Sequence, residues 1–180
     1  MRAELVVDAS QAFWYRPRMA EFAPLSRLPK GAVGILYEIA RHLLRRPVVG
    51  IAAVARDDDD RILLVRRVDT GTWALPGGTL EWGETLRRAL PREIEEETGA
   101  TWRALERVTG VYSRADRDPR FHAVTVCVAG RVDGPARGPK NPMEIREARF
   151  FATEDLPADL AMGMQDMLDD ALAGGDVVLE

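Results

Sequence analysis

The chain has 180 residues and a net charge of −4, with 46% hydrophobic and 30% charged residues. This length and composition are typical of one soluble globular domain with an extension, and they exclude a strongly basic nucleic-acid-binding module. The single cysteine excludes an internal disulfide framework, and no apolar stretch is long enough to span a membrane. We therefore expect a cytoplasmic protein whose partner is neither nucleic acid nor a membrane.

The N-terminal part, residues 1–47, is predicted to be a helical extension. Residues 31–46 place apolar side chains at three- and four-residue spacing, which predicts a helix that Pro47 ends. The helix is basic, but we expect it to pack on its own domain or on a second copy rather than on a membrane. We predict a homodimer whose arm crosses between subunits, where an aromatic residue such as Trp14 suits the interface.

Two strands are predicted at the start of the main domain, which covers residues 48–180. The apolar runs at residues 48–55 and 61–67 are typical of strands. The four aspartates at 57–60 are interpreted as the polar turn between them rather than as a metal site. A short extended segment at residues 73–75 follows.

Three glutamates mark the helix that comes next. Glu93, Glu96 and Glu97 are three and four residues apart, so a helix places their carboxylates on one face, where like charges repel. Gly99 is expected to end the helix, and the negative end of the helix dipole disfavours acids there. Considered alone, these acids fit a solvated face and a divalent-cation site equally well.

The residues around these glutamates favour the cation site. Residues 78–100 read GTLEWGETLRRALPREIEEETGA. This stretch resembles the Nudix box of hydrolases that act on nucleoside diphosphates linked to another moiety, and every fixed position of that pattern is filled. The resemblance extends from about residue 48 to about residue 174. It implies an α/β/α sandwich with a mixed, curved sheet, and hydrolysis of a phosphoanhydride bond.

The same resemblance implies the metal site and its acids. The residues that match the family's metal ligands are Gly77, through its carbonyl oxygen, Glu93, Glu96 and Glu97. Magnesium is the implied metal, and manganese is a possible substitute. Glu93 matches either a ligand or the general base. Glu144 has the placing of a further catalytic acid before the last strand, with Glu147 as its competitor, and the base is left open among these acids.

Residues beside the acids are expected to support them. Arg92 is grouped with the catalytic residues because a guanidinium can fix carboxylates through paired hydrogen bonds; a plain surface ion pair is the alternative. Glu84 is expected to be mainly structural, at the helix start, where it could pair with Arg88. Pro91 lies inside the predicted helix and removes one backbone hydrogen bond, so a kink is expected.

A second pair of predicted strands, residues 100–113 and 120–132, bears on the substrate. Their segment around RADRDPR resembles Nudix enzymes acting on ADP-ribose and other nucleoside diphosphate sugars. Its guanidinium groups suit phosphate, but an exposed charged turn is the alternative. The candidates for substrate contact in and near these strands are Arg66, Arg67, Tyr112, Arg114, Arg117, Arg120 and Phe121.

The remaining elements are a strand and a helix. A last strand is predicted at residues 147–151, and a helix at 153–173 whose apolar face is expected to pack on the core. Cys127 lies in an apolar run and is expected to be a buried, inert thiol.

Two classes of small-molecule nucleotide substrate stay open. A nucleoside diphosphate sugar such as ADP-ribose is favoured, and an oxidised or noncanonical nucleoside triphosphate is the alternative. A regulator that binds a nucleotide sugar without cleaving it would be expected to lack box acids, which this chain retains.

Overall fold

The computed structural model describes residues 34–40, 46–134 and 136–180. Residues 34–40 are helical, in line with the helix predicted there. Residues 1–33 and 41–45 of the predicted extension, which include Trp14 and most of the proposed dimer arm, lie outside the described residues. The second compact unit, Arg45–Glu180, is built on one sheet.

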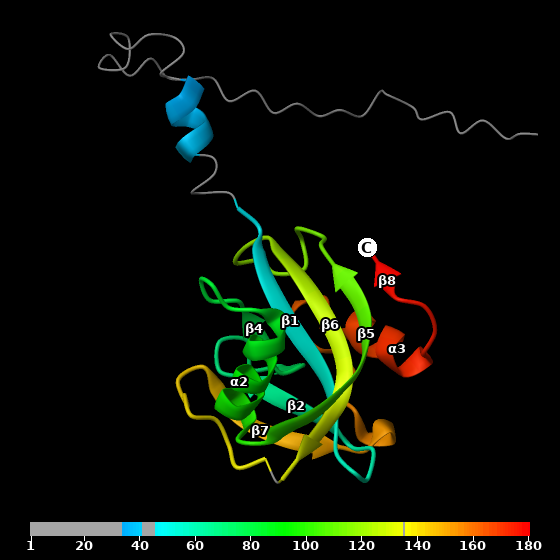
Figure 1. The fold of residues 1–180 in the computed structure, drawn as a ribbon. Coiled ribbons are helices and arrows are strands. Elements are labelled where there is room, and N and C mark those ends of the chain that lie inside the picture. Colours follow the sequence, from blue (N-terminus) through cyan, green and yellow to red (C-terminus); the bar gives the residue numbers. More distant parts are fainter. Residues whose placement is uncertain (1–33, 41–45, 135) are drawn as a thin grey trace, which may run out of the picture. The chain divides into compact units, whose positions relative to one another are not determined.

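The elements of this unit follow one another as the sequence pattern indicates, with two additional short strands (Figure 1). Its strands are β1 (Val48–Arg56), β2 (Ile62–Arg67), β3 (Trp73–Ala74), β4 (Gly77–Thr79), β5 (Thr101–Tyr112), β6 (Ala123–Asp133), β7 (Ile145–Phe151) and β8 (Val178–Leu179). Its helices are α2 (Leu86–Thr98) and α3 (Met164–Ala173), with 3-10 turns η3 (Thr153–Asp155) and η4 (Ala161–Gly163).

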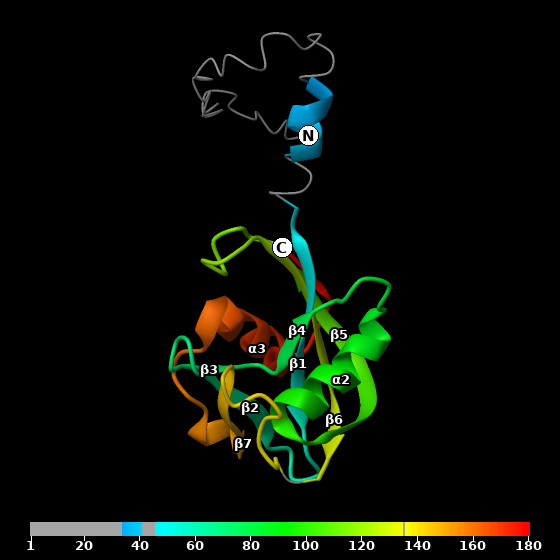
Figure 2. The same ribbon diagram turned by 90° about the vertical axis from the view of Figure 1, so that its left-hand side faces the viewer.

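The sheet is mixed, with strand order β3-β2-β1-β6-β5-β8. Strands β1 and β6 run parallel along the whole of β1, whereas β5–β6 and β2–β7 are antiparallel pairs. Helix α2 lies on one face of the sheet and α3 on the other (Figure 2). The predicted α/β/α sandwich is confirmed.

Central strand β1 is buried on both faces, which explains its nearly continuous apolar sequence. Ile51, Ala53 and Ala55 pack in the cluster that contains Leu90 and Ile94 of α2. The alternate residues of β1 pack in the cluster that contains Met167, Leu168 and Ala171 of α3. The two faces follow directly from the two-residue period of a strand.

The sheet opens between β1 and β2, and this opening positions the site. These two strands pair only at Arg56 and Ile62, next to the turn that joins them. Further along, β4 pairs with β1 at Gly50, Ile51 and Ala52 instead. Pro76 extends this contact, because its carbonyl accepts a hydrogen bond from the Ala53 amide at 3.0 Å. The segment after Pro76 is thereby held between the sheet and α2.

The predicted helix at residues 153–173 is wrong in its first half. Only Met164–Ala173 form α3, and the preceding residues form the two 3-10 turns and irregular chain. Two local features oppose a continuous helix: Leu160 makes a backbone bridge with Trp73, and Met162 has a positive φ of 56°. The apolar face of α3 nevertheless packs on the core, as predicted.

Two smaller expectations are also met in this unit. The aspartates at 57–60 form a turn that is paired with arginines, including an Asp60–Arg131 pair at 2.7 Å. Cys127 is free and buried, and burial raises the pKa of its thiol to about 11. Among the described residues, no helix is both long and apolar enough to cross a membrane.

Candidate active site

Helix α2 presents the glutamates close to its C-terminal end. The helix continues through Pro91 and ends at Gly99, which has a φ of 71° and donates its amide to the Glu95 carbonyl at 2.9 Å. The Lys140 amide donates to the Glu96 carbonyl at 2.7 Å. The segment before β7 therefore closes over the end of α2 and brings Glu144 near the box glutamates.

Glu97 is the most buried of the candidate acids, with 8% of the residue exposed. Its Oε2 accepts a hydrogen bond from the Gly77 amide at 2.8 Å. Burial raises the pKa of Glu97 to about 8; the Gly77 bond opposes this, and the charges of Glu93 and Glu144 add to it. The surroundings of Glu97 thus disfavour its charged form.

Glu93 lies directly against the backbone of the β4 segment. A Cβ atom built on Gly78 would fall 2.6 Å from the Glu93 carboxylate carbon. At Gly77, with a φ of 152°, a Cβ atom would fall 2.8 Å from the Cα of Ala52 in β1. Both glycines are therefore needed for the close approach of chain and carboxylates.

Replacing Gly78 with alanine is expected to displace the Glu93 carboxylate, because that flexible side chain can move whereas β4 cannot. We expect lower metal affinity and kcat, with a thermal midpoint close to that of the wild type. Metal titration and differential scanning calorimetry on both proteins measure this. A variant with wild-type metal affinity and kcat would show that Glu93 does not need its observed position.

Arg92 joins three acids and differs from a simple surface ion pair. It makes a two-pronged contact with Glu84, at 2.9 Å from Nε to Oε1 and 2.8 Å from Nη2 to Oε2. Its Nη1 lies 3.0 Å from Glu93 Oε1 and 3.3 Å from Glu96 Oε2. Glu84 therefore pairs with Arg92, rather than with Arg88 as the sequence suggested. Arg92 contacts these acids but does not line the cavities.

Two adjoining cavities meet at these acids. One, of about 260 Å³, is lined by Glu93, Glu96, Glu97 and Glu144 together with Lys140. The other, of about 270 Å³, occupies the opening between β1 and β2. Glu97 and Glu144 line both cavities, so the acids lie at the boundary between them.

The donor set of the first cavity fits a hard divalent cation, which prefers carboxylate oxygens. In the part of the chain that the structure describes, no three Asp, Glu, His or Cys side chains are arranged as a ready set of ligands. Glu93 and Glu96 are turned to Arg92, and Glu97 to the Gly77 amide. Their carboxylates would need to rotate to share a cation. A cation would offset both the burial and the neighbouring charges that raise the pKa of Glu97.

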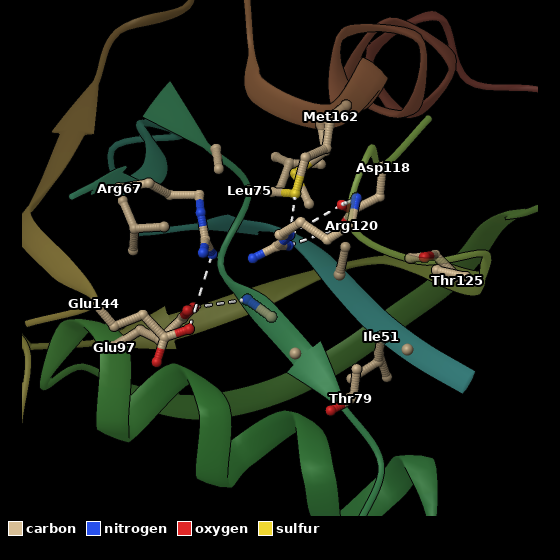
Figure 3. Close-up of a pocket in the computed structure, with 18 of the residues that line it drawn as sticks. Ile51, Arg67, Leu75, Thr79, Glu97, Asp118, Arg120, Thr125, Glu144 and Met162 are labelled. Atoms are coloured by element: carbon tan, nitrogen blue, oxygen red, sulfur yellow. Dashed lines mark hydrogen bonds and ion pairs between the residues drawn. The ribbon is translucent and has the colours of Figure 1, made fainter. Parts of the chain in front are cut away.

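Two of the predicted substrate arginines line the second cavity. Figure 3 shows Arg67 and Arg120 turned toward each other, with Glu97 and Glu144 on the α2 side. Arg67 is 8% exposed and makes two contacts with Asp69, at 2.9 and 2.8 Å. Its Nη1 lies 3.9 Å from Glu144. A buried guanidinium is therefore available beside the acids.

The other candidate arginines lie outside this cavity. Arg66 contacts Glu147 at 3.3 Å, and Glu147 lies within β7. Arg114 contacts Asp116 at 3.3 Å. Arg117 pairs with Asp166 at 3.0 Å and stands over a tyrosine ring.

That tyrosine, Tyr112, is buried, with 1% of the residue exposed. Its hydroxyl donates to Asp170 at 2.8 Å, in the α3 layer. Its aromatic ring belongs to the core cluster on the α3 side of the sheet. The structure thus gives it a packing position, whereas Phe121 from the same list lines the second cavity.

Arg120 has three contacts that the sequence did not indicate: Asp118 and Met162, which line the cavity, and Asp69, which does not. Asp118 binds Arg120 at 2.9 and 2.7 Å, and Asp69 lies 3.4 Å from the same guanidinium. The Met162 sulfur lies 3.1 Å from Arg120 Nη2. Each aspartate lies two residues from an arginine that it contacts, Asp69 from Arg67 and Asp118 from Arg120, and this spacing could have indicated both ion pairs. Nothing in the sequence indicates the position of Met162.

Comparison with known proteins identifies the family. Residues 44–171 match the NUDIX domain. Over 118 residues, which are 64% of this chain and 68% of the relative, the sequence is 38% identical to an ADP-ribose pyrophosphatase of Methanocaldococcus jannaschii. A putative 8-oxo-dGTP diphosphatase of Bacillus subtilis is 38% identical over 47% of this chain, and the match spans about half of that protein, 54%.

A solved structure agrees with these matches. The MutT NUDIX hydrolase of Burkholderia pseudomallei superimposes with a TM-score of 0.61 and 32% identity, over 70% of this chain and 98% of that one. An open mixed sheet flanked by helices, with an acid-lined cleft beside a glycine turn, defines the class of fold and site. The chain belongs to the Nudix family. It is accordingly a pyrophosphohydrolase.

Proposed function

We propose that this enzyme hydrolyses the phosphoanhydride bond of a nucleoside diphosphate sugar such as ADP-ribose, with magnesium as its metal. The observation that supports this most is the shared boundary of the two cavities. Carboxylates line one side of it and two arginines the other. A diphosphate can therefore lie between a cation held by the acids and the guanidinium groups.

Each residue has a role in this proposal. Glu93, Glu96, Glu97 and the carbonyl of Gly77 would hold the cation. When bound, the cation would neutralise phosphate charge and lower the pKa of a bound water. Glu144, exposed at the boundary, or Glu93 accepts the proton of the attacking water. Arg67 and Arg120 bind the phosphate oxygens, and Arg92 orients the acids.

Both substrate classes have support among the relatives. The archaeal ADP-ribose pyrophosphatase matches a larger share of this chain, 64%, than the bacterial 8-oxo-dGTP protein, 47%. We therefore favour the nucleoside diphosphate sugar, and keep the nucleoside triphosphate as the second candidate. A homodimer, a cytoplasmic location and the use of manganese stay predictions from the sequence.

ADP-ribose is expected to give a higher kcat/KM than 8-oxo-dGTP when both are assayed with Mg²⁺ and all products are identified. The Arg67→Ala change is expected to raise KM for ADP-ribose about 10- to 100-fold, because it removes charge-assisted hydrogen bonds. Arg66→Ala is the matched control, since the neighbouring guanidinium contacts Glu147 and Gly71 instead. Faster turnover of 8-oxo-dGTP would contradict the substrate class, and equal effects of the two changes would contradict the role of Arg67.

A further inference from the structure

The carboxylate of Glu180, which lines neither of the two cavities, binds several groups in the loop that joins β5 to β6. The side chain of Glu180 accepts the amides of Ser113 and Arg114, each at 2.8 Å. It also binds Arg117, through Nη2 at 2.5 Å and Nε at 3.1 Å. The Glu180 amide donates to Val111 at 3.0 Å, beyond the short parallel pairing of β8 with β5. Backbone and side chain together hold Glu180 against this loop.

Arg117 extends this contact from the loop to the start of α3. Its Nη1 donates to the Gly163 carbonyl at 2.5 Å, and its Nη2 lies 3.0 Å from Asp166. The guanidinium carbon stands 5.1 Å from the centre of the Tyr112 ring. The Arg117 side chain is 8% exposed, and that of Glu180 is 18% exposed. This is a charge pair largely shielded from water, unlike a typical surface ion pair.

The far side of the same loop reaches the substrate cavity. Three residues after Arg117, Arg120 lines that cavity and lies 3.1 Å from the sulfur of Met162. Met162 immediately precedes Gly163, the residue that Arg117 binds. Arg117 thus links two walls of the cavity, the β5–β6 loop and the turn before α3, through contacts that lie outside the cavity.

We propose that Glu180 is a positioning residue for substrate binding, which holds the Arg120 side of the loop in place through Arg117 without contacting the substrate. This inference rests on the proposed function, because it requires that Arg120 bind the phosphates. The physical reason is preorganisation. A guanidinium already held where the phosphate arrives loses less conformational freedom on binding.

The ionic character of Glu180 supports this role. The hydrogen bond from Arg117 lowers the pKa of Glu180 to about 2. Burial opposes this shift, and the hydrogen bonds from the Arg114 and Ser113 amides add to it. Glu180 therefore remains charged throughout the neutral range in which a nucleotide hydrolase is assayed. The contacts of Glu180 and Arg117 include none of the box glutamates, so we expect them to form without a metal.

A double-mutant cycle with Arg120 tests the proposal. Glu180→Ala is expected to raise KM for ADP-ribose about tenfold with little change in kcat. Glu180→Gln, whose amide oxygen still accepts the two backbone hydrogen bonds, is expected to give a smaller rise. In the Arg120→Ala background, Glu180→Ala is expected to add nothing further, because both changes remove the same interaction. Glu106→Ala, which breaks a 2.7 Å ion pair with Arg131 elsewhere on β5, is the control.

The outcomes separate this proposal from the function on which it rests. If Arg120→Ala raises KM and Glu180→Ala leaves it unchanged, Glu180 is not a positioning residue. The same conclusion follows if the two effects multiply, since Glu180 then acts independently of Arg120. If Arg120→Ala itself leaves KM unchanged, the proposed phosphate contact is wrong. Circular dichroism melts of all variants test whether unfolding causes a change in KM. If Glu180→Ala melts at a lower temperature than the wild type, Glu180→Gln replaces it in the cycle.

Discussion

Replacing Glu97 with glutamine is expected to lower kcat for ADP-ribose by about 10²- to 10⁴-fold, because a bound cation supplies several kcal/mol of transition-state stabilisation and each 1.4 kcal/mol is about tenfold in rate. Glutamine keeps the shape of the side chain and can still accept the Gly77 amide at this position. It removes a negative charge that we propose as a metal ligand. Steady-state kinetics at saturating Mg²⁺ measures the loss. A variant with wild-type kcat would exclude Glu97 from the site.

The same variant is expected to be more stable than the wild type when metal is removed. Because burial raises the pKa of Glu97 to about 8, the folded state binds its proton more tightly than the unfolded state does. The wild type therefore loses stability as pH rises from the unfolded pKa, about 4.3, to about 8. The stability gap between variant and wild type should be small near pH 4 and largest above pH 8.

Thermal melts in a chelator at both ends of this pH range measure the gap. Glu95→Gln is the matched control, because that side chain stands on the same helix but is 61% exposed and paired with Lys140. It should give no pH-dependent gap. A gap of equal size at pH 4 and pH 9 for Glu97→Gln would contradict the buried, uncompensated charge.

Replacing Arg92 with alanine is expected to lower both activity and stability. Glu84, Glu93 and Glu96 would lose their shared partner, and their carboxylates would repel. Residues that orient metal ligands typically contribute 10- to 100-fold in metal affinity or activity. The free energy of unfolding should fall by about 1.5–3 kcal/mol, as for a lost charged hydrogen bond. Kinetics and urea unfolding measure the two effects.

Two further variants sharpen this test. Arg92→Lys retains the charge but not the planar fork that contacts Glu84 twice, so it should recover only part of the activity. Arg88→Ala lies one turn earlier on an exposed part of α2 and is the control. Full recovery by lysine would show that charge alone matters, and wild-type behaviour of Arg92→Ala would reduce the arginine to an incidental ion pair.

The parts of the fold that depend on local spacing could be predicted from the sequence. The helix that carries Glu93, Glu96 and Glu97 follows from their spacing and from Gly99, which adopts the left-handed conformation at its end. The central strand follows from its apolar run, because a strand buried on both faces needs no alternation. The contact between Arg92 and Glu96 likewise follows from their four-residue spacing on the helix.

The parts that depend on contacts between distant segments could not be predicted. The helix expected at 153–173 is interrupted where Leu160 bridges to Trp73, more than 80 residues earlier in the chain. Arg117 and Arg120 look equivalent in the loop sequence. In the structure Arg117 pairs with Glu180, whereas Arg120 lines the cavity. Burial of Tyr112 likewise depends on α3, and no local pattern around the tyrosine signals it.

We propose that the acid-lined cleft hydrolyses a nucleoside diphosphate sugar with the help of a divalent cation. The most direct measurement follows ADP-ribose and its products, first with chelated protein and then after Mg²⁺ is restored. We predict no turnover in chelator, and equal amounts of AMP and ribose 5-phosphate once Mg²⁺ is added. Turnover that persists in chelator, or ADP-ribose that stays intact with Mg²⁺ present, would contradict the claim.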